Sequence, residues 1–410
     1  MINYARRSLD GVWVGDCIGN LGQLYFCHDI LRALESGIVK FGGQLDKFQN
    51  QFQYSDDTEE CVVLYNHIME AKGEGADNYP LIDQDKLAMG FATRYMTRDP
   101  DGEIYGYVLN TRKVLKDIYE GVPWTEANKF IKPKAEGMPS HIDSLVDSLS
   151  KGKDMKAAMH EVNLVLERQK KGETGRELQG SCGNGSAMRV PPLGAYLATD
   201  WGGCIQPQHL TSDGFYKFEK KLIVEAVRQA EVTHCHPEGV AGSIAATLLS
   251  YLITEKVMLD YKHPATFYYT NLLRCVPRGQ VWDGIMTAAE LPMDMPVGLV
   301  IQKLGNGTHV TCQDTVPFCC YMAIKAIMTY PKDEMFEKTI IETSMAFGDV
   351  DTNCAIVGGI IANAGPPPEK WVKFCQPMDD VVDTDIPQTW LDPSVDEEIN
   401  RLVDDLEGEV

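Results

Sequence analysis

The sequence predicts an all-α fold, and three observations support this prediction. Apolar residues recur at helical spacing in segment after segment, alternating two-residue patterns bounded by turns are scarce, and two clusters of acidic and hydroxyl residues stand directly before apolar stripes. At 410 residues, with 44% hydrophobic and 24% charged residues, the chain has the composition of a globular protein. We therefore expect helices packed around a sizeable hydrophobic core.

The individual helices follow from apolar stripes that recur every three or four residues, which is the pattern of one helix face. The stripes are, in chain order, Leu9, Val12, Trp13 and Cys17; Cys61, Leu64, Tyr65 and Ile68; Val162, Val165, Leu166 and Gln169; Leu222, Val224, Ala226, Val227 and Ala230; a long run at 239–253; and a last run at 355–364. The Gly-Pro-Pro-Pro sequence at 365–368 ends this last helix, because proline cannot continue one.

The remainder of the chain is acidic. We assign residues 1–365 to one domain and residues 366–410 to a solvated C-terminal extension, since charge runs of this kind are usually surface.

Net charge and cysteine usage exclude several classes of protein. The formal charge of −21 opposes nonspecific attraction to nucleic acid or to an anionic membrane. The twelve cysteines form no C-x-x-C pair, which argues against a zinc site and against a disulfide framework. The N-terminus has no clean hydrophobic region of a signal peptide, and no window approaches an uninterrupted apolar span. We expect a cytoplasmic protein with reduced thiols and no membrane partner.

Two clusters carry the strongest chemical signal, YSDDTEE at residues 54–60 and FGDVDTNC at residues 347–354. Asp, Ser and Thr are favoured at helix starts, where they satisfy free N–H groups, so capping alone is one interpretation. The other is that the clusters converge on hard divalent cations, because Mg²⁺ prefers oxygen ligands. Their carboxylates and hydroxyls would suit a site for two metal ions.

A glycine-rich stretch, LQGSCGNGSAMR at residues 178–189, leads toward a helix. Glycines let backbone N–H groups approach an anion closely, so a phosphate or diphosphate cradle is one interpretation and a plain turn is the other. Further along, His234 and His236 precede a helix without zinc-site spacing. Hydrogen bonding or stacking of His234 against a ligand is favoured over metal binding, with a structural loop histidine as the alternative.

Five motifs occur in fixed order along the chain: GDCIG at 15–19, SDDT at 55–58, GNGSAMR at 183–189 with PLG at 192–194, TH at 233–234, and GDVDT at 348–352. This order resembles the ADP-ribosylglycohydrolase family, which includes the dinitrogenase-reductase-activating glycohydrolases. The resemblance extends over about residues 8–365. It implies a compact, orthogonal all-α domain with a central binuclear magnesium site, in which manganese sometimes replaces magnesium.

The resemblance also implies roles for individual residues. The implied metal ligands are Ser55, Asp56, Asp57, Asp349, Asp351 and Thr352, and the implied substrate-binding residues are Ser181, Cys182, Gly183, Asn184, Gly185 and His234. Three positions depart from the family pattern: Gln23 stands where members often have Glu, Ser55 where Thr is usual, and Cys182 where some have an aromatic residue. The identity of the acid-base group is therefore open among Asp56, Asp57, Asp351 and Glu35, the only Glu between residues 23 and 54.

The implied activity is Mg²⁺-dependent hydrolysis of the glycosidic bond that joins ADP-ribose to an acceptor, which builds oxocarbenium character at the anomeric carbon. We expect a monomer that acts on an ADP-ribosylated protein or another ADP-ribose conjugate. Two alternatives stay open. One is a binding or immunity-type protein of the same fold without turnover, and the other is a two-metal phosphohydrolase that cuts the diphosphate.

Overall fold

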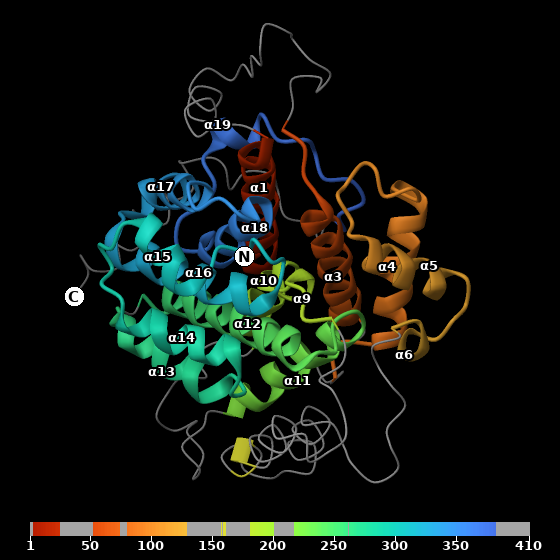
Figure 1. Ribbon diagram of the computed structural model, residues 1–410, viewed down its shortest axis with the longest axis horizontal. Helices are drawn as coiled ribbons and strands as arrows, with labels where there is room; N and C mark the ends of the chain where they lie inside the picture. Colours follow the sequence, from red (N-terminus) through yellow and green to blue (C-terminus); the bar gives the residue numbers. More distant parts are fainter. Residues whose placement is uncertain are drawn as a thin grey trace, which may run out of the picture.

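The computed structural model describes residues 3–24, 52–73, 80–128, 157, 159–160, 181–200, 217–260 and 262–382. Throughout this part the elements are α-helices, and the β-pairing is limited to two isolated bridges, Phe52 with Cys375 and Gly183 with Thr311. The predicted all-α fold is confirmed (Figure 1). The helix predicted around residues 162–169 lies outside the described residues.

The first half of the described chain contributes α1 (Tyr4–Leu24), α3 (Asp56–Gly73), α4 (Gln84–Arg98), α5 (Leu109–Tyr119), α6 (Trp124–Ala127), α9 (Gly185–Met188), α10 (Pro191–Asp200) and α11 (Lys217–Glu231). The second half contributes α12 (Pro237–Met258), α13 (Ala265–Cys275), α14 (Gln280–Glu290), α15 (Val297–Leu304), α16 (Cys312–Thr329), α17 (Lys332–Ser344), α18 (Val350–Ile361) and α19 (Glu369–Val372). In Figure 1, α3 to α6 lie on one side of α1 and α18, and α13 to α17 lie on the other.

Helices α1 and α18 pack closely because glycines line the face of α1 that meets α18. A Cβ atom on Gly15 would overlap the carbonyl oxygen of Cys354, and one on Gly11 would overlap the carbonyl oxygen of Gly358. Only glycine permits such an approach of two backbones. The contact places Asp16, which follows Gly15, beside the N-terminal end of α18.

Helix α12 forms much of the interior. Pro237 occupies its first turn, and Nδ1 of His236 accepts a hydrogen bond from the Glu238 amide, so the free N-terminal groups are partly satisfied. Every residue from 238 to 255 is buried. Among the described helices, α12 alone is long and apolar enough to cross a membrane. Its apolar surface is instead covered by α10, α11 and α16.

Residues 366–382 pack against the helical body, although the sequence placed them in a solvated extension. Trp371 is fully buried, and the indole N–H of Trp13 donates to the carbonyl oxygen of Gln376 at 2.7 Å. The backbone of Phe52 also pairs with this segment, donating to Phe374 and accepting from Gln376. The domain boundary at residue 365 stays a prediction, and residues 383–410 lie outside the described part.

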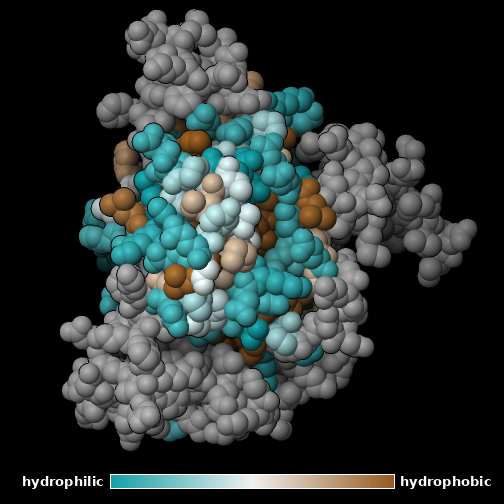
Figure 2. Space-filling model, turned by 90° about the vertical axis from the view of Figure 1, so that its right-hand side faces the viewer, coloured by the Kyte–Doolittle hydropathy of each residue, from teal (hydrophilic) through white to brown (hydrophobic). Residues whose placement is uncertain are grey.

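The surface on one side of the molecule is mostly hydrophilic. In the view turned from Figure 1, the coloured residues are largely polar, and apolar side chains are scattered among them (Figure 2). Scattered apolar residues are normal on a protein surface. This face therefore offers no large apolar patch among the residues that the structure describes.

Candidate functional site

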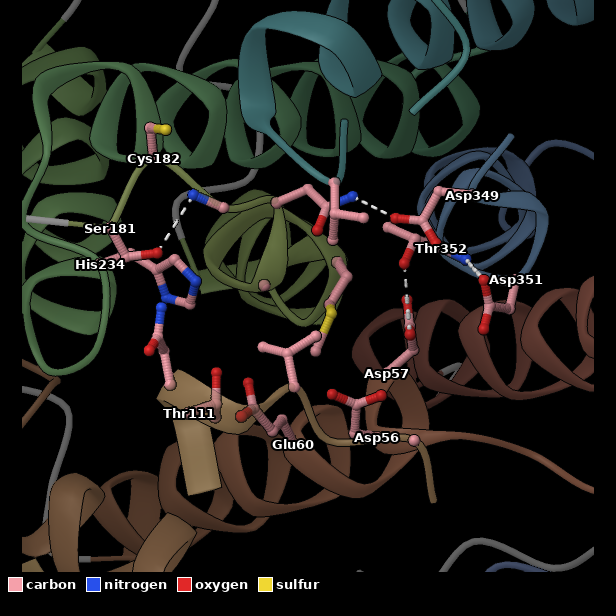
Figure 3. A pocket seen from close by; sticks show the side chains of 18 residues that line it. Asp56, Asp57, Glu60, Thr111, Ser181, Cys182, His234, Asp349, Asp351 and Thr352 are labelled. Carbon is pink, nitrogen blue, oxygen red and sulfur yellow. Dashed lines mark hydrogen bonds between the residues drawn. The ribbon is translucent and has the colours of Figure 1, made fainter. Parts of the chain in front are cut away.

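A cavity of about 550 Å³ opens between α3, the start of α5, the glycine-rich loop and the start of α18 (Figure 3). Its lining residues are Asp56, Asp57, Glu60, Gly106, Val108, Asn110, Thr111, Ser181, Cys182, Gly183, Asn184, Gly185, Met188, His234, Val310, Asp349, Asp351 and Thr352. Both acidic clusters, the glycine-rich loop and His234 thus meet in one place, although they are far apart in the sequence. The volume lies within the range of small-molecule sites.

Three aspartates from three helices converge at one end of this cavity. Asp16 of α1, Asp57 of α3 and Asp351 of α18 each offer a carboxylate oxygen, and these atoms all lie within 4.8 Å of one another. The Oδ1 atoms of Asp16 and Asp57 are buried and have no hydrogen-bond partner among the described residues. Since buried charged groups require pairing or a metal ion, the arrangement fits a hard divalent cation.

Asp16 is held in place by the N-terminus of α3. Its Oδ2 accepts hydrogen bonds from the Ser55 amide at 2.9 Å, the Thr58 amide at 3.1 Å and the Thr58 hydroxyl at 2.6 Å. The first amides of a helix are otherwise unsatisfied, and the helix dipole favours a negative charge there. One oxygen of Asp16 therefore caps α3, which leaves the other oxygen for the aspartate cluster.

Ser55 and Thr352, both implied metal ligands, contact Asp57 in this structure. The Ser55 hydroxyl donates to Asp57 Oδ2 at 2.9 Å, and the Thr352 hydroxyl donates to the same atom at 3.4 Å. Both bonds reach the same oxygen, which leaves Oδ1 of Asp57 for the aspartate cluster. Their role as metal ligands stays a prediction.

Burial raises the pKa values of these aspartates, and neighbouring aspartates raise those of Asp57, Asp349 and Asp351 further. Burial raises the pKa of Asp16 to about 6, against the hydrogen bonds from Thr58 and Ser55. Burial, followed by the neighbouring Asp351, raises the pKa of Asp349 to about 7. Burial and the charges of nearby aspartates also raise the pKa of Asp57 well above its usual value. A bound cation would offset this repulsion.

The glycine-rich loop makes room for the His234 ring. A Cβ on Gly185 would lie 2.7 Å from Cε1 of His234, and a Cβ on Gly183 would lie 3.1 Å from its Nε2. The side-chain amide of Asn184 donates to Asp349 Oδ2 at 2.5 Å and to the Thr315 hydroxyl at 3.0 Å. The loop therefore links the imidazole on one side with the aspartates on the other.

Buried polar contacts connect His234 to the far side of the cavity. Its Nδ1 lies 2.7 Å from the Thr233 hydroxyl, which accepts a hydrogen bond from Arg189 at 2.9 Å. Arg189 in turn pairs with Glu60 at 2.7 Å. Burial and then the Arg189 charge lower the pKa of His234 to about 3, so the imidazole is neutral near pH 7.

All six predicted substrate-binding residues line the cavity, and so do all predicted metal ligands except Ser55, which lies behind Asp57. Glu35 and the side chain of Gln23 lie outside the described residues. Sequence reasoning missed two acidic residues, Asp16 and Glu60. For Asp16 the signal was available, since it lies within the glycine-flanked motif at 15–19.

Comparisons with known proteins identify the family of this chain. The family model described as ADP-ribosylglycohydrolase matches residues 2–410. An uncharacterized protein of Archaeoglobus fulgidus is 23% identical over 383 residues, which is 90% of this chain and 90% of that protein. A solved ADP-ribosylglycohydrolase-related protein complex contains a chain that is 15% identical, with 91% of this chain and 93% of that chain covered and a TM-score of 0.45. Since the family model extends over all but the first residue, this chain belongs to the ADP-ribosylglycohydrolase family.

Proposed function

We propose that this protein is a Mg²⁺-dependent hydrolase that cleaves the glycosidic bond between ADP-ribose and an acceptor. The observation that carries the proposal is the aspartate cluster of Asp16, Asp57 and Asp351, in which the buried Oδ1 atoms of Asp16 and Asp57 have no hydrogen-bond partner among the described residues, beside the ligand-sized cavity. Family membership supports the same activity. The substrate class is an ADP-ribosylated protein or another ADP-ribose conjugate, and we propose that the protein acts as a cytoplasmic monomer.

Asp16, Asp57 and Asp351 would hold the cation, with Asp56, Asp349, Ser55 and Thr352 as the further predicted ligands of a two-ion site. The all-oxygen set suits Mg²⁺, with Mn²⁺ as the alternative. When bound, such ions polarise water and neutralise developing charge. The aspartates would hold the cations at this end of the cavity, and a neighbouring carboxylate would accept the proton of the attacking water.

The loop at 181–185 and His234 would bind the diphosphate and the terminal ribose. Backbone amides of a glycine-rich loop suit an anion, and a neutral imidazole suits hydrogen bonding to an uncharged group. The acid-base group is proposed among Asp56, Asp57 and Asp351, which line the cavity, and Glu35.

A second candidate function is binding of ADP-ribose without turnover. Gln23 favours this alternative, because family members often carry a carboxylate at the matching position. The two proposals differ in whether free ADP-ribose is released.

The test is product analysis on a panel of ADP-ribosylated acceptors with and without Mg²⁺. We expect free ADP-ribose only with the metal, and AMP as product would indicate a phosphohydrolase instead.

The variant Asp351→Asn keeps the shape of the side chain but removes its charge. We expect it to fold normally without metal and to lose hydrolysis at least about 100-fold, the scale seen for positioned catalytic groups. Wild-type turnover by this variant at saturating Mg²⁺ would contradict the proposed metal site.

A further inference from the structure

Glu60 is an acidic residue of the cavity that stands outside the aspartate cluster. It lies on α3 and is almost fully buried, yet its carboxylate lines the cavity. Figure 3 shows this carboxylate directed into the open space, between Asp56 and Thr111. Within the described residues, its hydrogen bond is made through Oε2 to Arg189. The other oxygen therefore remains available on the cavity side.

Arg189 fixes the position of this carboxylate. The guanidinium is fully buried and donates to the side chain of Gln229 at 2.9 Å, to its carbonyl oxygen at 2.8 Å and to the Thr233 hydroxyl at 2.9 Å. It also stacks over the ring of Phe91 at 4.3 Å. A guanidinium with this many partners has one orientation, so Glu60 is preorganised.

The negative charge of the Glu60 carboxylate determines which kind of ligand group it can bind. Burial raises the pKa of Glu60, and the charge and hydrogen bond of Arg189 oppose this rise and stabilise the ionised carboxylate. An ionised carboxylate accepts hydrogen bonds without donating any. It would repel a phosphate, so it suits a hydroxyl group. Glu60 follows Asp56 by four residues on the same helix face, next to the proposed cleavage point. Under the proposed function, the sugar at that point is the terminal ribose.

We propose that Glu60 binds the substrate directly, its carboxylate accepting a hydrogen bond from a hydroxyl of the terminal ribose of ADP-ribose, with Arg189 as its positioning residue. This inference rests on the proposed function. It adds a substrate contact that requires neither a backbone amide of the loop nor a metal ion.

The test compares the affinities for ADP-ribose and for ADP, which lacks the terminal ribose, by titration calorimetry in Mg²⁺. In Glu60→Gln, Arg189 needs the amide oxygen, so neutral amide N–H groups face the cavity and the charged acceptor for the ribose hydroxyl is lost. We expect the Kd for ADP-ribose to rise about 10-fold or more, because a hydrogen bond to a charged group is lost. The Kd for ADP should change by less than about 2-fold, since ADP lacks the sugar that Glu60 contacts.

Glu59→Gln is the matched control. Glu59 is the adjacent residue, is buried and pairs with arginines, but it does not line the cavity. We expect this variant to retain the wild-type ratio of the two Kd values, even where its melting temperature falls. If Glu60→Gln does not fold, Glu60→Asp keeps the charge and withdraws it from the ligand, and the same selective loss is expected.

Three results would overturn the inference. An unchanged Kd ratio with a lower melting temperature would make Glu60 only the structural partner of Arg189. Equal losses for ADP-ribose and ADP would place its contact elsewhere on the ligand. Weaker Mg²⁺ binding without nucleotide would make it a metal ligand. Failure of the wild-type protein to bind ADP-ribose would contradict the proposed function itself, whichever residue is varied.

Discussion

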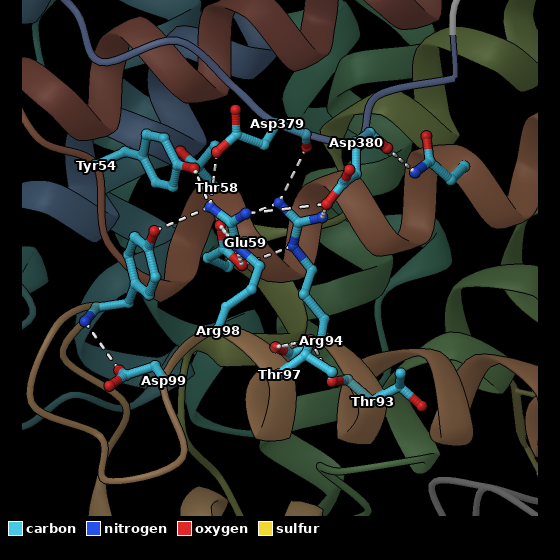
Figure 4. A network of polar contacts seen from close by, with 12 residues as sticks. Tyr54, Thr58, Glu59, Thr93, Arg94, Thr97, Arg98, Asp99, Asp379 and Asp380 are labelled. Carbon is cyan, nitrogen blue, oxygen red and sulfur yellow. Dashed lines mark hydrogen bonds and ion pairs between the residues drawn. The ribbon is translucent and has the colours of Figure 1, made fainter.

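Two neighbouring glutamates of α3 point in different directions from the helix and have different surroundings. Glu59 uses both carboxylate oxygens, with Arg94 at 2.6 and 3.0 Å and with Arg98 at 3.1 Å (Figure 4). Glu60 bonds to Arg189 through one oxygen and lines the cavity. Both are buried and paired with arginine, but only Glu59 is enclosed by its partners.

On one helix, the enclosed Glu59 serves stability, while Glu60 is free to serve the cavity. On the Glu59 side, the acidic Asp379 and Asp380 complete a network with the two arginines (Figure 4). On the cavity side, Arg189 is the one cation among the described residues that pairs with the carboxylates of α3. The excess negative charge there is what a bound cation would offset.

The largest expected effect comes from removing the central carboxylate of the network of Glu59, Arg94, Arg98, Asp379 and Asp380, which we call the Glu59 network. Glu59→Ala should lower the free energy of unfolding by about 3–5 kcal/mol, because it leaves the buried Arg94 with only the distant, exposed carboxylate of Asp380 at 3.9 Å. Urea denaturation would measure the loss. Glu103→Ala, at an exposed residue of the same region, should change stability by less than about 0.5 kcal/mol. A loss in Glu59→Ala no larger than in this control would show that the network does not stabilise the fold.

An intermediate effect is expected in the pH dependence of the unfolding free energy, through the aspartates of the cavity. The pKa of Asp16 is raised to about 6 and that of Asp349 to about 7, mainly by burial. As pH rises, the unfolded chain releases these protons first, so the folded state becomes less stable through these pKa values. The free energy of unfolding in EDTA should therefore fall between about pH 4, the ordinary pKa of Asp, and about pH 7, by up to about 1.4 kcal/mol per pH unit for each proton involved, and the melting temperature should fall with it.

Added Mg²⁺ should flatten this decline, because a bound cation stabilises the ionised carboxylates. Asp16→Asn should also have a shallower slope than the wild-type protein, since one of the raised pKa values is removed. A melting temperature that rises with pH in EDTA would contradict the pKa directions on which the comparison depends.

The smallest effect is expected at an exposed carboxylate of the Glu59 network. Asp379 contacts Arg98 at 3.1 Å, but its side chain is 57% exposed. Asp379→Asn should therefore cost less than about 1 kcal/mol of unfolding free energy, and less still at high salt. A loss as large as that of Glu59→Ala would mean that the C-terminal segment is essential to the network.

The fold class and most of the cavity were predictable because their signals are local. Helical apolar stripes and oxygen-rich helix starts can be recognised within a few residues, and both acidic clusters do line one cavity. The order of the motifs along the chain added the family, which the family model confirms.

The division of labour between Glu59 and Glu60 was not predictable in this way. The two residues are adjacent and chemically identical, and their roles differ because of arginines 35 and 129 residues away. Asp16 could be recognised by its motif at 15–19, but its contact with the N-terminus of α3 joins residues 39 and 42 positions apart. The packing of residues 366–382 also depends on distant partners. Their acidic composition alone had predicted a solvent-exposed extension.

The glycine contact between α1 and α18 limits how far the backbones that carry two members of the aspartate cluster can move apart. Asp16 and Asp351 belong to helices whose main chains touch directly at Gly15 and Cys354. No rotatable side chain lies in that contact, so thermal repacking of rotamers cannot lengthen it. The contact therefore fixes the separation of the two main chains that carry Asp16 and Asp351, and only the torsions of the aspartate side chains can change the distance between the two carboxylates.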